Sequence, residues 1–204
     1  MTAAEIALVV IAALAVIAGL LVWHARRLDR LHRRILDTRA ILETQLNQRS
    51  EMATQLALSG LLDEASTVVV AEAAFQAGIH ADRLVRPDEA AGGSLGTLAA
   101  APLSGGLDRG QAESDLTVAL REALGEPADR ELMAAAGGAG ELLEQLERTC
   151  YRVQLARRFH NETVVAALGL RATWPVRLFR LAGRAPSPRP VDMDDEVFDA
   201  GAGS

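Results

Sequence analysis

An uninterrupted run of 18 uncharged residues, from Ile6 to Trp23, constrains the fold more than any other feature of this chain. As an α-helix the run is about 27 Å long, because each residue rises about 1.5 Å, and this length matches the hydrocarbon core of a bilayer. The run also lacks the polar stripe that a helix in a protein core usually has. The sequence therefore predicts a single transmembrane helix over about residues 6–23.

Charged residues flank this run unequally. Five arginines follow within residues 26–34, against a single Asp29, whereas Glu5 is the only charged side chain before the run. Since arginine-rich flanks stay in the cytoplasm, we expect a short external N-terminus and a cytoplasmic C-terminal part. Trp23 lies where an interfacial aromatic side chain would anchor the span. We assign the membrane anchor to Ile6, Trp23, Arg26 and Arg27.

A cleavable signal peptide is the alternative to a retained anchor. Such a peptide begins with basic residues and ends at a small-residue cleavage site. Here the start has no Arg or Lys, and a strongly basic segment follows the apolar run. Because this polarity is the reverse of that of a signal peptide, we expect the span to be retained.

Charge is segregated along the chain, although the net charge is only −6. Residues 61–147 carry five arginines and 16 acidic residues, whereas residues 148–190 carry nine arginines and one acidic residue. Aromatic residues make up 3%, which gives no stacking platform for nucleic acid, and no nucleic-acid-binding motif accompanies the basic segment. We expect the lipid bilayer and other membrane or cytoplasmic proteins as partners, and no nucleic acid.

Apolar residues recur at helical spacing along most of the remaining chain. The expected helices are residues 28–60 (continuing the span and ending near Gly60), 61–80, about 108–125 (capped by Asp108), a short one starting near Pro127, and 141–168. In the second helix the expected inner face is Leu62, Ala65, Val69, Ala73 and Gln76. Residues 86–110 are rich in Pro, Gly and Ala and are expected to form a loop.

No segment shows the period-two alternation of a strand. The sequence thus predicts an all-α fold, with an N-terminal transmembrane helix followed by an antiparallel helical bundle with long helices and a disordered tail. The expected parts are residues 1–23 with the span, residues 24–180 as the cytoplasmic bundle with the 86–110 loop, and residues 181–204 as a Pro-rich, then acidic, disordered tail.

Residues 147–164, ERTCYRVQLARRFHNETV, resemble the most recognisable stretch of the LemA family, in which an Arg and an Ala-Arg-Arg group precede an Asn-acid pair and Val. The matching positions are Arg152, Ala156, Arg157, Arg158, Asn161, Glu162 and Val164. Residues 44–57 look like the family's second landmark through Leu46, Arg49, Met52 and Leu56, and Trp174–Pro175 is similar to the aromatic-Pro step after the family's last helix.

The chain departs from the family pattern at two motif positions and in the Gly/Ala-rich stretches 86–110 and 134–140, which have no family counterpart. The proline usual after the landmark arginine is absent, and His160 replaces the usual Tyr before Asn161. The resemblance implies a membrane-anchored, mostly helical protein with a short external N-terminus and a cytoplasmic bundle. It implies no established catalytic activity. The family-motif residues expected to have structural roles are Leu46, Arg49, Arg152, Arg157, Arg158 and Asn161.

Catalytic and metal-binding patterns are not evident in the sequence. The four histidines lack metal-ligand spacing, and Cys150, the only cysteine, excludes an internal disulfide and sits in an apolar helical pattern. Two interpretations stay open for Arg49, Arg152, Arg158 and Asn161. They form interhelical ion pairs and hydrogen bonds that fix helix register, which we favour, or they form an anion-binding or partner-docking patch.

Two functional hypotheses follow. The first is a non-enzymatic, membrane-anchored scaffold or interaction protein on the cytoplasmic face of a bacterial membrane, without cofactor or metal, and with a homo-oligomer left open by the Ala15 and Gly19 pair in the span. The second is an envelope coiled-coil protein of cell division or wall assembly that acts outside the membrane. The two hypotheses require opposite orientations of the chain.

Overall fold

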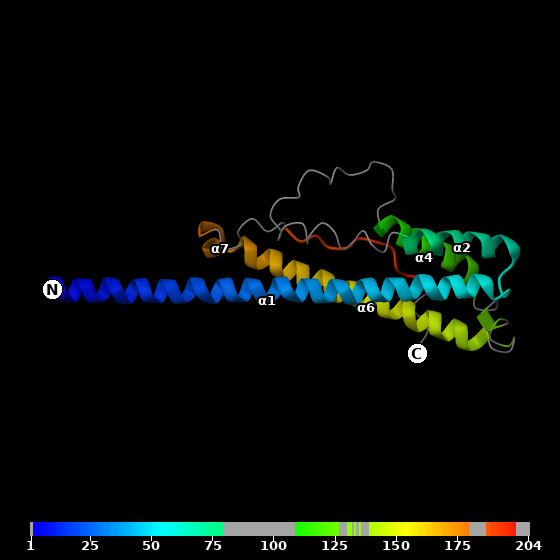
Figure 1. The fold of residues 1–204 in the computed structure, drawn as a ribbon, viewed down its shortest axis with the longest axis horizontal. Helices are drawn as coiled ribbons and strands as arrows, with labels where there is room; N and C mark the ends of the chain where they lie inside the picture. Colours follow the sequence, from blue (N-terminus) through cyan, green and yellow to red (C-terminus); the bar gives the residue numbers. More distant parts are fainter. Residues whose placement is uncertain are drawn as a thin grey trace. The chain divides into compact units, whose positions relative to one another are not determined.

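The computed structural model describes residues 2–79, 109–126, 139–179 and 187–198, together with Arg130, Glu131, Met133 and Ala135. Over these residues the chain forms no strand and the helices α1 (Ala3–Leu58), α2 (Glu64–Ile79), α4 (Arg109–Leu124), α6 (Ala139–Ala172) and α7 (Trp174–Leu178), shown in Figure 1. The predicted all-α fold is confirmed.

The ends of the helices follow local signals. Helix α1 ends two residues before Gly60, whose φ of 73° lies in the left-handed region that glycine adopts without steric cost. Helix α2 begins after Asp63, whose carboxylate accepts hydrogen bonds from the N–H groups of Ala65 and Ser66 at 2.9 and 3.1 Å. Bonds from Ser66 are the largest cause of the lowered pKa of Asp63.

Helix α4 begins earlier than the predicted loop allowed. Arg109 and Gly110 are helical, so the loop expected over 86–110 ends before them. The side chain of Arg109 is buried, which fixes this first turn of α4. The rest of that loop, the Asp108 cap and Pro127 lie outside the described residues. The expected last helix, 141–168, is α6, which extends further at both ends.

The chain divides into two compact units, which are described separately. The first unit combines Met1–Thr38 with Asn161–Pro190, and the second combines Arg39–His160 with Val191–Ser204. Each unit therefore contains part of α1 and part of α6. The expected division at residues 23 and 180 follows the apolar span and the composition of the tail, whereas these compact units divide within the two long helices.

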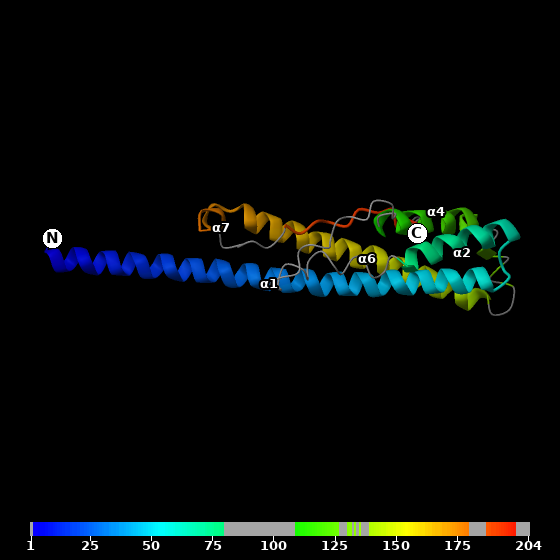
Figure 2. The ribbon, with the colours of Figure 1, turned by 45° about the horizontal axis from the view of Figure 1, so that its top comes forward.

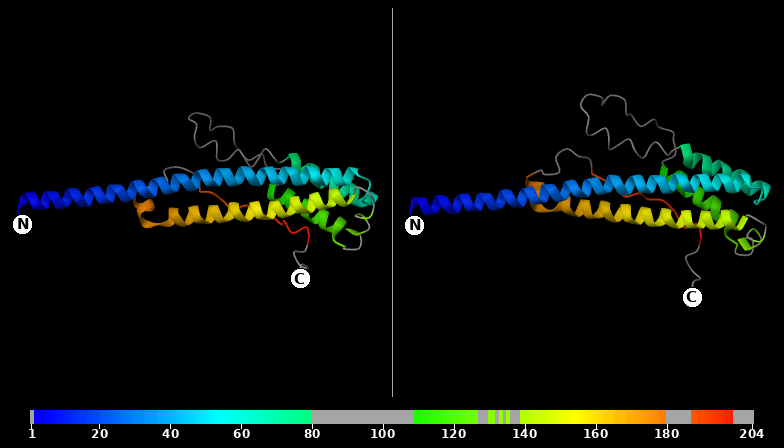
Figure 3. Two further views of the ribbon diagram at one scale, coloured as in Figure 1. Left: turned by 90° about the horizontal axis from the view of Figure 1, so that it is seen from below. Right: turned by 60° about the horizontal axis from the view of Figure 1, so that its bottom comes forward.

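The first unit packs the early part of α1 against the late part of α6, and Figure 3 shows the two helices running antiparallel there. Its core is a small cluster in which Ile35, Val164 and Ala167 are buried and Leu31 and Leu168 are partly buried. The spacing of Ile35 from Leu31, and of Val164 from Ala167 and Leu168, is that of one helix face. This cluster fixes which residues of α1 and α6 lie level with each other.

Helix α1 is long and apolar enough to cross a membrane, which bears out the predicted span as far as length and composition go. None of its apolar window is buried by the described protein residues. Leu8 and Ile11, for example, are 71% and 67% exposed. A core helix of a water-soluble protein buries such side chains against protein, so this segment differs from a core helix.

The second unit has its core where α1, α2, α4 and α6 meet. The completely buried side chains there include Val70 of α2, Leu116 and Leu120 of α4, and Leu146 of α6. Helix α2 packs directly against α4, as Figures 1 and 2 both show. Cys150 lies in this core, and burial raises the pKa of its thiol to about 11. The prediction that Cys150 is buried is confirmed.

The inner face expected for α2 was wrong by about one position. The buried residues are Leu62, Val70, Ala74 and Ala77, whereas Ala65 is exposed and Val69 is 50% exposed. The physical reason is that α2 is apolar almost all round, so that its hydrophobic pattern does not select a face. The helix consequently leaves apolar side chains on its outer side.

The tail is irregular but packed over its described part. Residues 187–198 form neither helix nor strand, in line with the irregular chain expected there. Within them, Met193, Asp195 and Val197 are buried, and the residues between them are exposed. This alternation is that of an extended chain lying on a surface, so the described end of the tail is packed although it has no regular secondary structure.

Gly60→Ala tests the C-terminal end of α1. Because φ at Gly60 is 73°, a Cβ there is expected to lower the free energy of unfolding by about 1–2 kcal/mol. Gly78→Ala is the control, since Gly78 is helical and its Cβ would meet only Ser50 Oγ at 3.9 Å; it should raise stability by about 0.5–1 kcal/mol. Urea unfolding followed by circular dichroism in detergent measures both. Equal effects of the two substitutions would contradict the left-handed cap.

Candidate functional site

A charged residue occupies the centre of the apolar stripe of α1. Leu42, Leu46, Arg49, Ala53 and Leu56 recur at alternating spacings of four and three, and all are buried. This is the spacing of a helix seam, in which a single polar residue fixes register at some cost in stability. Arg49 is completely buried, so its guanidinium must find partners inside the bundle.

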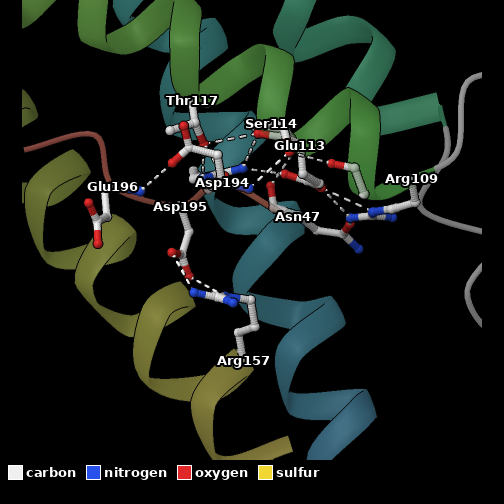
Figure 4. A network of polar contacts seen from close by, with 12 residues as sticks. Asn47, Arg109, Glu113, Ser114, Thr117, Arg157, Asp194, Asp195 and Glu196 are labelled. Atoms are coloured by element: carbon white, nitrogen blue, oxygen red, sulfur yellow. Dashed lines mark hydrogen bonds and ion pairs between the residues drawn. The ribbon is translucent and has the colours of Figure 1, made fainter. Parts of the chain in front are cut away.

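Those partners come from α4. Arg49 Nη2 donates to Glu113 Oε2 at 2.6 Å and to the Glu113 carbonyl oxygen at 2.9 Å, and Nη1 donates to Thr117 Oγ1 at 3.0 Å. Glu113 and Thr117 are also completely buried. They are four residues apart on α4 and so face the same side of the helix. Figure 4 shows this side of α4 above α1.

A second arginine shares the same carboxylate. Arg109, one turn before Glu113, donates from Nε to Glu113 Oε1 at 3.0 Å and from Nη2 to Asn47 Oδ1 at 3.0 Å. Arg109 is 3% exposed, which is rare for an arginine unless it is paired. The network thus ties α1 to α4 through two guanidinium groups and one carboxylate.

The tail joins the network through Thr117, which also binds Arg49. Thr117 Oγ1 donates to the Asp194 carbonyl oxygen at 2.8 Å, and the Asp194 N–H donates to Ser114 Oγ at 3.0 Å. Arg121 Nη2 lies 2.9 and 2.8 Å from the two carboxylate oxygens of Asp194. The next residue, Asp195, turns to the opposite side (Figure 4).

The Asp194 carboxyl titrates below its ordinary range. Desolvation raises its pKa, but the bonds from Arg121 and from the Glu196 N–H, with the field of Arg49, outweigh desolvation, so that the pKa is lowered from 3.8. A carboxyl whose pKa is lower in the folded chain stabilises the fold above its unfolded pKa, and this contribution is lost as the pH falls through the folded value. The stabilisation contributed by the Asp194 carboxylate is therefore lost only in acid.

Asp195 connects the tail to α6. Arg157 donates to both of its carboxylate oxygens, from Nε at 2.5 Å and from Nη2 at 2.8 Å, in the bidentate geometry that arginine favours. This bond raises the pKa of Arg157 further. Gln154 Nε2 also donates to the Asp195 carbonyl oxygen at 2.9 Å. Through neighbouring residues 194 and 195, the tail thus joins α4 to α6.

The predicted family-motif residues differ in how far they are buried. Leu46 and Arg49 are completely buried, and Arg157 is half-buried against Asp195. Arg152 and Arg158 are exposed, and Asn161 is half-buried in the first unit. Arg152 makes no ion pair with any described residue, so the interhelical pair expected there does not form within this part of the chain.

The predicted anchor residues lie on the exposed N-terminal part of α1. Ile6 is 51% exposed, and Arg26 and Arg27 are exposed. The Arg27 guanidinium lies over the Trp23 ring, 5.5 Å from its centroid, which is a cation–π contact. Trp23 itself is 50% exposed.

Sequence reasoning missed Glu113 and Thr117 as the partners of Arg49. It also missed Arg109, Asn47 and the acidic tail as further members of the network. One signal was present for Glu113, which lies three and seven residues before Leu116 and Leu120 and so occupies a position in the apolar stripe of α4. A charged residue inside such a stripe points to a buried partner. The alternation of apolar and acidic residues in 191–198 was the corresponding signal for the tail.

A groove between α2 and α4 is the second notable feature of the second unit. We call it the acidic groove; it has a volume of about 650 Å³, and its apolar lining residues are Val68, Val69, Ala73, Val118 and Ala119. Val68 and Val69 are 64% and 50% exposed, and Val118 is 42% exposed. Three carboxylates, those of Glu72, Asp115 and Glu122, also line it. None of the three forms an ion pair with a described residue.

Two chemical features of the described residues can be stated. Among them no three His, Cys, Asp or Glu side chains are grouped to hold a metal ion. Cys150 is buried with a raised pKa, which is the opposite of an activated nucleophile. In the polar network, Glu113 accepts from both arginines, whereas Arg49 Nε and Arg109 Nη1 have no hydrogen-bond partner among the described residues. No family model, curated protein or solved structure matches the chain. The resemblance to the LemA family therefore stays a prediction.

Glu113→Ala tests the network. Removing the carboxylate leaves Arg49 and Arg109 buried without it, and loss of one member of a buried ion pair costs about 3–5 kcal/mol. The urea dependence of thiol labelling at Cys150 measures this loss of stability, because the buried thiol reacts only when the second unit opens. Glu122→Ala, an exposed change on the same helix, should stay within about 0.5 kcal/mol. Equal labelling midpoints for the two variants would rule out the proposed role of Glu113.

Proposed function

We propose that this chain is a membrane-anchored, non-enzymatic helical scaffold that binds another protein at the cytoplasmic face of a bacterial membrane, as its resemblance to the LemA family implies. The proposal has three parts: the anchor, the orientation and the binding surface. Each has its own support.

The anchor is supported by α1. Its apolar window is long enough to cross a bilayer, and none of it is buried by the described residues. Exposing such a segment to water is costly, since each Å² of apolar surface costs about 25 cal/mol. Lipid removes this cost, and all backbone hydrogen bonds of the span stay within the helix. The orientation is supported by the arginines at 26–34, which favour the cytoplasmic side.

The binding function is carried by one observation, the acidic groove. Exposed valines line it, although α2 and α4 have buried apolar residues on their inner faces as well. Apolar side chains gathered in a groove with charged groups at its edge are typical of a site for an amphipathic helix. Because the charged groups are Glu72, Asp115 and Glu122, the fitting partner is a helix with Lys or Arg beside its apolar face.

A scaffold function, rather than catalysis, is supported by how the polar residues are used. Arg49, Glu113 and Arg109 bind one another, and their positions connect α1 to α4 rather than opening on a cavity. The acidic groove has carboxylates, but Glu72 and Asp115 accept hydrogen bonds from Gln76 and Gln111 four residues away on their own helices. These are arrangements of a stable binding surface.

Photo-cross-linking in native membranes tests this function. A photoreactive amino acid replaces Val118 in the groove, and replaces the exposed Val165 of α6 in the matched control. We expect an adduct with another protein from position 118 and not from position 165. Adding Val69→Asp should reduce the adduct about tenfold, since an unpaired carboxylate in an apolar contact costs more than about 1.4 kcal/mol.

The possible outcomes separate the alternatives. Because Val69 is half-exposed, Val69→Asp should leave the circular dichroism spectrum and urea midpoint unchanged. An adduct that contains two differently tagged copies of this chain would replace the hetero-partner by self-association. Equal adducts from positions 118 and 165, or none from either, would contradict a binding function of the groove.

A further inference from the structure

The segment after α6 exposes aromatic and aliphatic side chains on a very short helix. Trp174, at the start of α7, is 72% exposed, Leu178 is 66% exposed, and Phe179 is 45% exposed. Trp174 and Leu178 are four residues apart and so share one face of the helix. Val176, between them, is 1% exposed and points inward. The exposed group is therefore presented by a helix fixed to the first unit.

The backbone around α7 is well defined by local contacts. Thr173 has an extended conformation with φ −65° and ψ 143°, and Pro175 follows at the start of the helix, where proline is favoured. The N–H of Thr173 donates to the Leu170 carbonyl at 3.1 Å, and the N–H of Phe179 donates to the Pro175 carbonyl at 3.1 Å. These bonds turn the chain sharply at the end of α6, as the orange segment in Figure 3 shows.

The level of α7 along α1 follows from the packing of the first unit. Leu31 of α1 and Leu168 of α6 lie in one apolar cluster, and the helices are antiparallel. Four residues further along α6 is its last residue, Ala172, about 6 Å beyond Leu168. The same distance back along α1 leads from Leu31 to Arg27. Helix α7 therefore begins level with Arg27, one turn from Trp23, at the end of the apolar span.

The charge of this region is mainly positive, because its one acidic residue on α1, Asp29, is paired with Arg33 at 2.7 Å. Arg26, Arg27 and Arg30 are exposed on α1, and Arg177 is exposed on α7. The sequence has no acidic residue between Glu162 and Asp192. Arginines beside exposed Trp, Phe and Leu are the composition of a segment that lies in a membrane interface, where aromatic rings occupy the headgroup level and arginines bind anionic lipid.

We propose that α7 is a second membrane contact, with Trp174, Leu178 and Phe179 inserted in the interface of the same leaflet that Trp23 reaches, and with Arg177 at the anionic headgroups. This inference rests on the proposed membrane anchor, because α1 determines where the bilayer surface lies. The exposed side chains of α7 would contact the lipid surface, because they lie next to the end of the apolar span and because the charge of Arg177 complements anionic headgroups. Anchored at both α1 and α7, the first unit would be held at a fixed height on the membrane.

The chain has two tryptophans, Trp23 and Trp174, which makes fluorescence quenching the direct test. Full-length protein with Trp23→Phe reports Trp174 alone, and protein with Trp174→Phe reports Trp23 alone. Each is reconstituted in vesicles of phosphatidylcholine and phosphatidylglycerol that contain lipids brominated near the headgroup end of the acyl chain. A control has both tryptophans replaced by Phe, with Val165→Trp, which lies further along α6 from the membrane end and is exposed.

We expect Trp174 to be quenched nearly as strongly as Trp23 and at least about twofold more than the control, since interfacial tryptophans lie at headgroup level. Arg177→Gln should weaken quenching of Trp174 in vesicles with phosphatidylglycerol and leave it unchanged in pure phosphatidylcholine. Quenching of Trp23 without quenching of Trp174 would overturn this inference and leave the anchor standing. If neither tryptophan were quenched, the anchor and this inference would both fail.

Discussion

Helix α1 places the constraint on which the rest of the structure depends, because its two parts need different surroundings. Residues 6–22 expose aliphatic side chains on every side, and from Ile35 onward one stripe is buried against protein. A helix can pass between such surroundings without a break, since its backbone hydrogen bonds are internal in both. The arginines at 26–34 mark the transition.

The buried part of α1 is specified by polar as well as apolar contacts. Hydrophobic packing alone would allow two packed helices to shift in register by one turn. Arg49 of α1, in contrast, can meet Glu113 and Thr117 of α4 in one register only. The tail adds to this specification. With Asp194 on Arg121 of α4 and Asp195 on Arg157 of α6, a segment without regular structure connects two helices.

The sequence predicted the elements whose signal is local. The end of α1 near Gly60, the end of α4 near Gly125 and the burial of Cys150 follow from spacing and from helix-ending residues. The partners of Arg49 could not be chosen, because the choice among 27 Asp and Glu residues depends on which helices pack together. The outer face of α2 was also beyond prediction, since its apolar residues surround the helix.

The orientation of the chain is the most direct test of the account as a whole. Single-cysteine variants, Thr2→Cys and Glu144→Cys in a Cys150→Ala background, are labelled with a membrane-impermeant maleimide in intact spheroplasts and after lysis; both positions are exposed. The account predicts that position 2 is labelled in intact spheroplasts and position 144 only after lysis. Labelling of position 144 in intact spheroplasts, as an envelope protein acting outside the membrane requires, or recovery of either variant in the soluble fraction would contradict it.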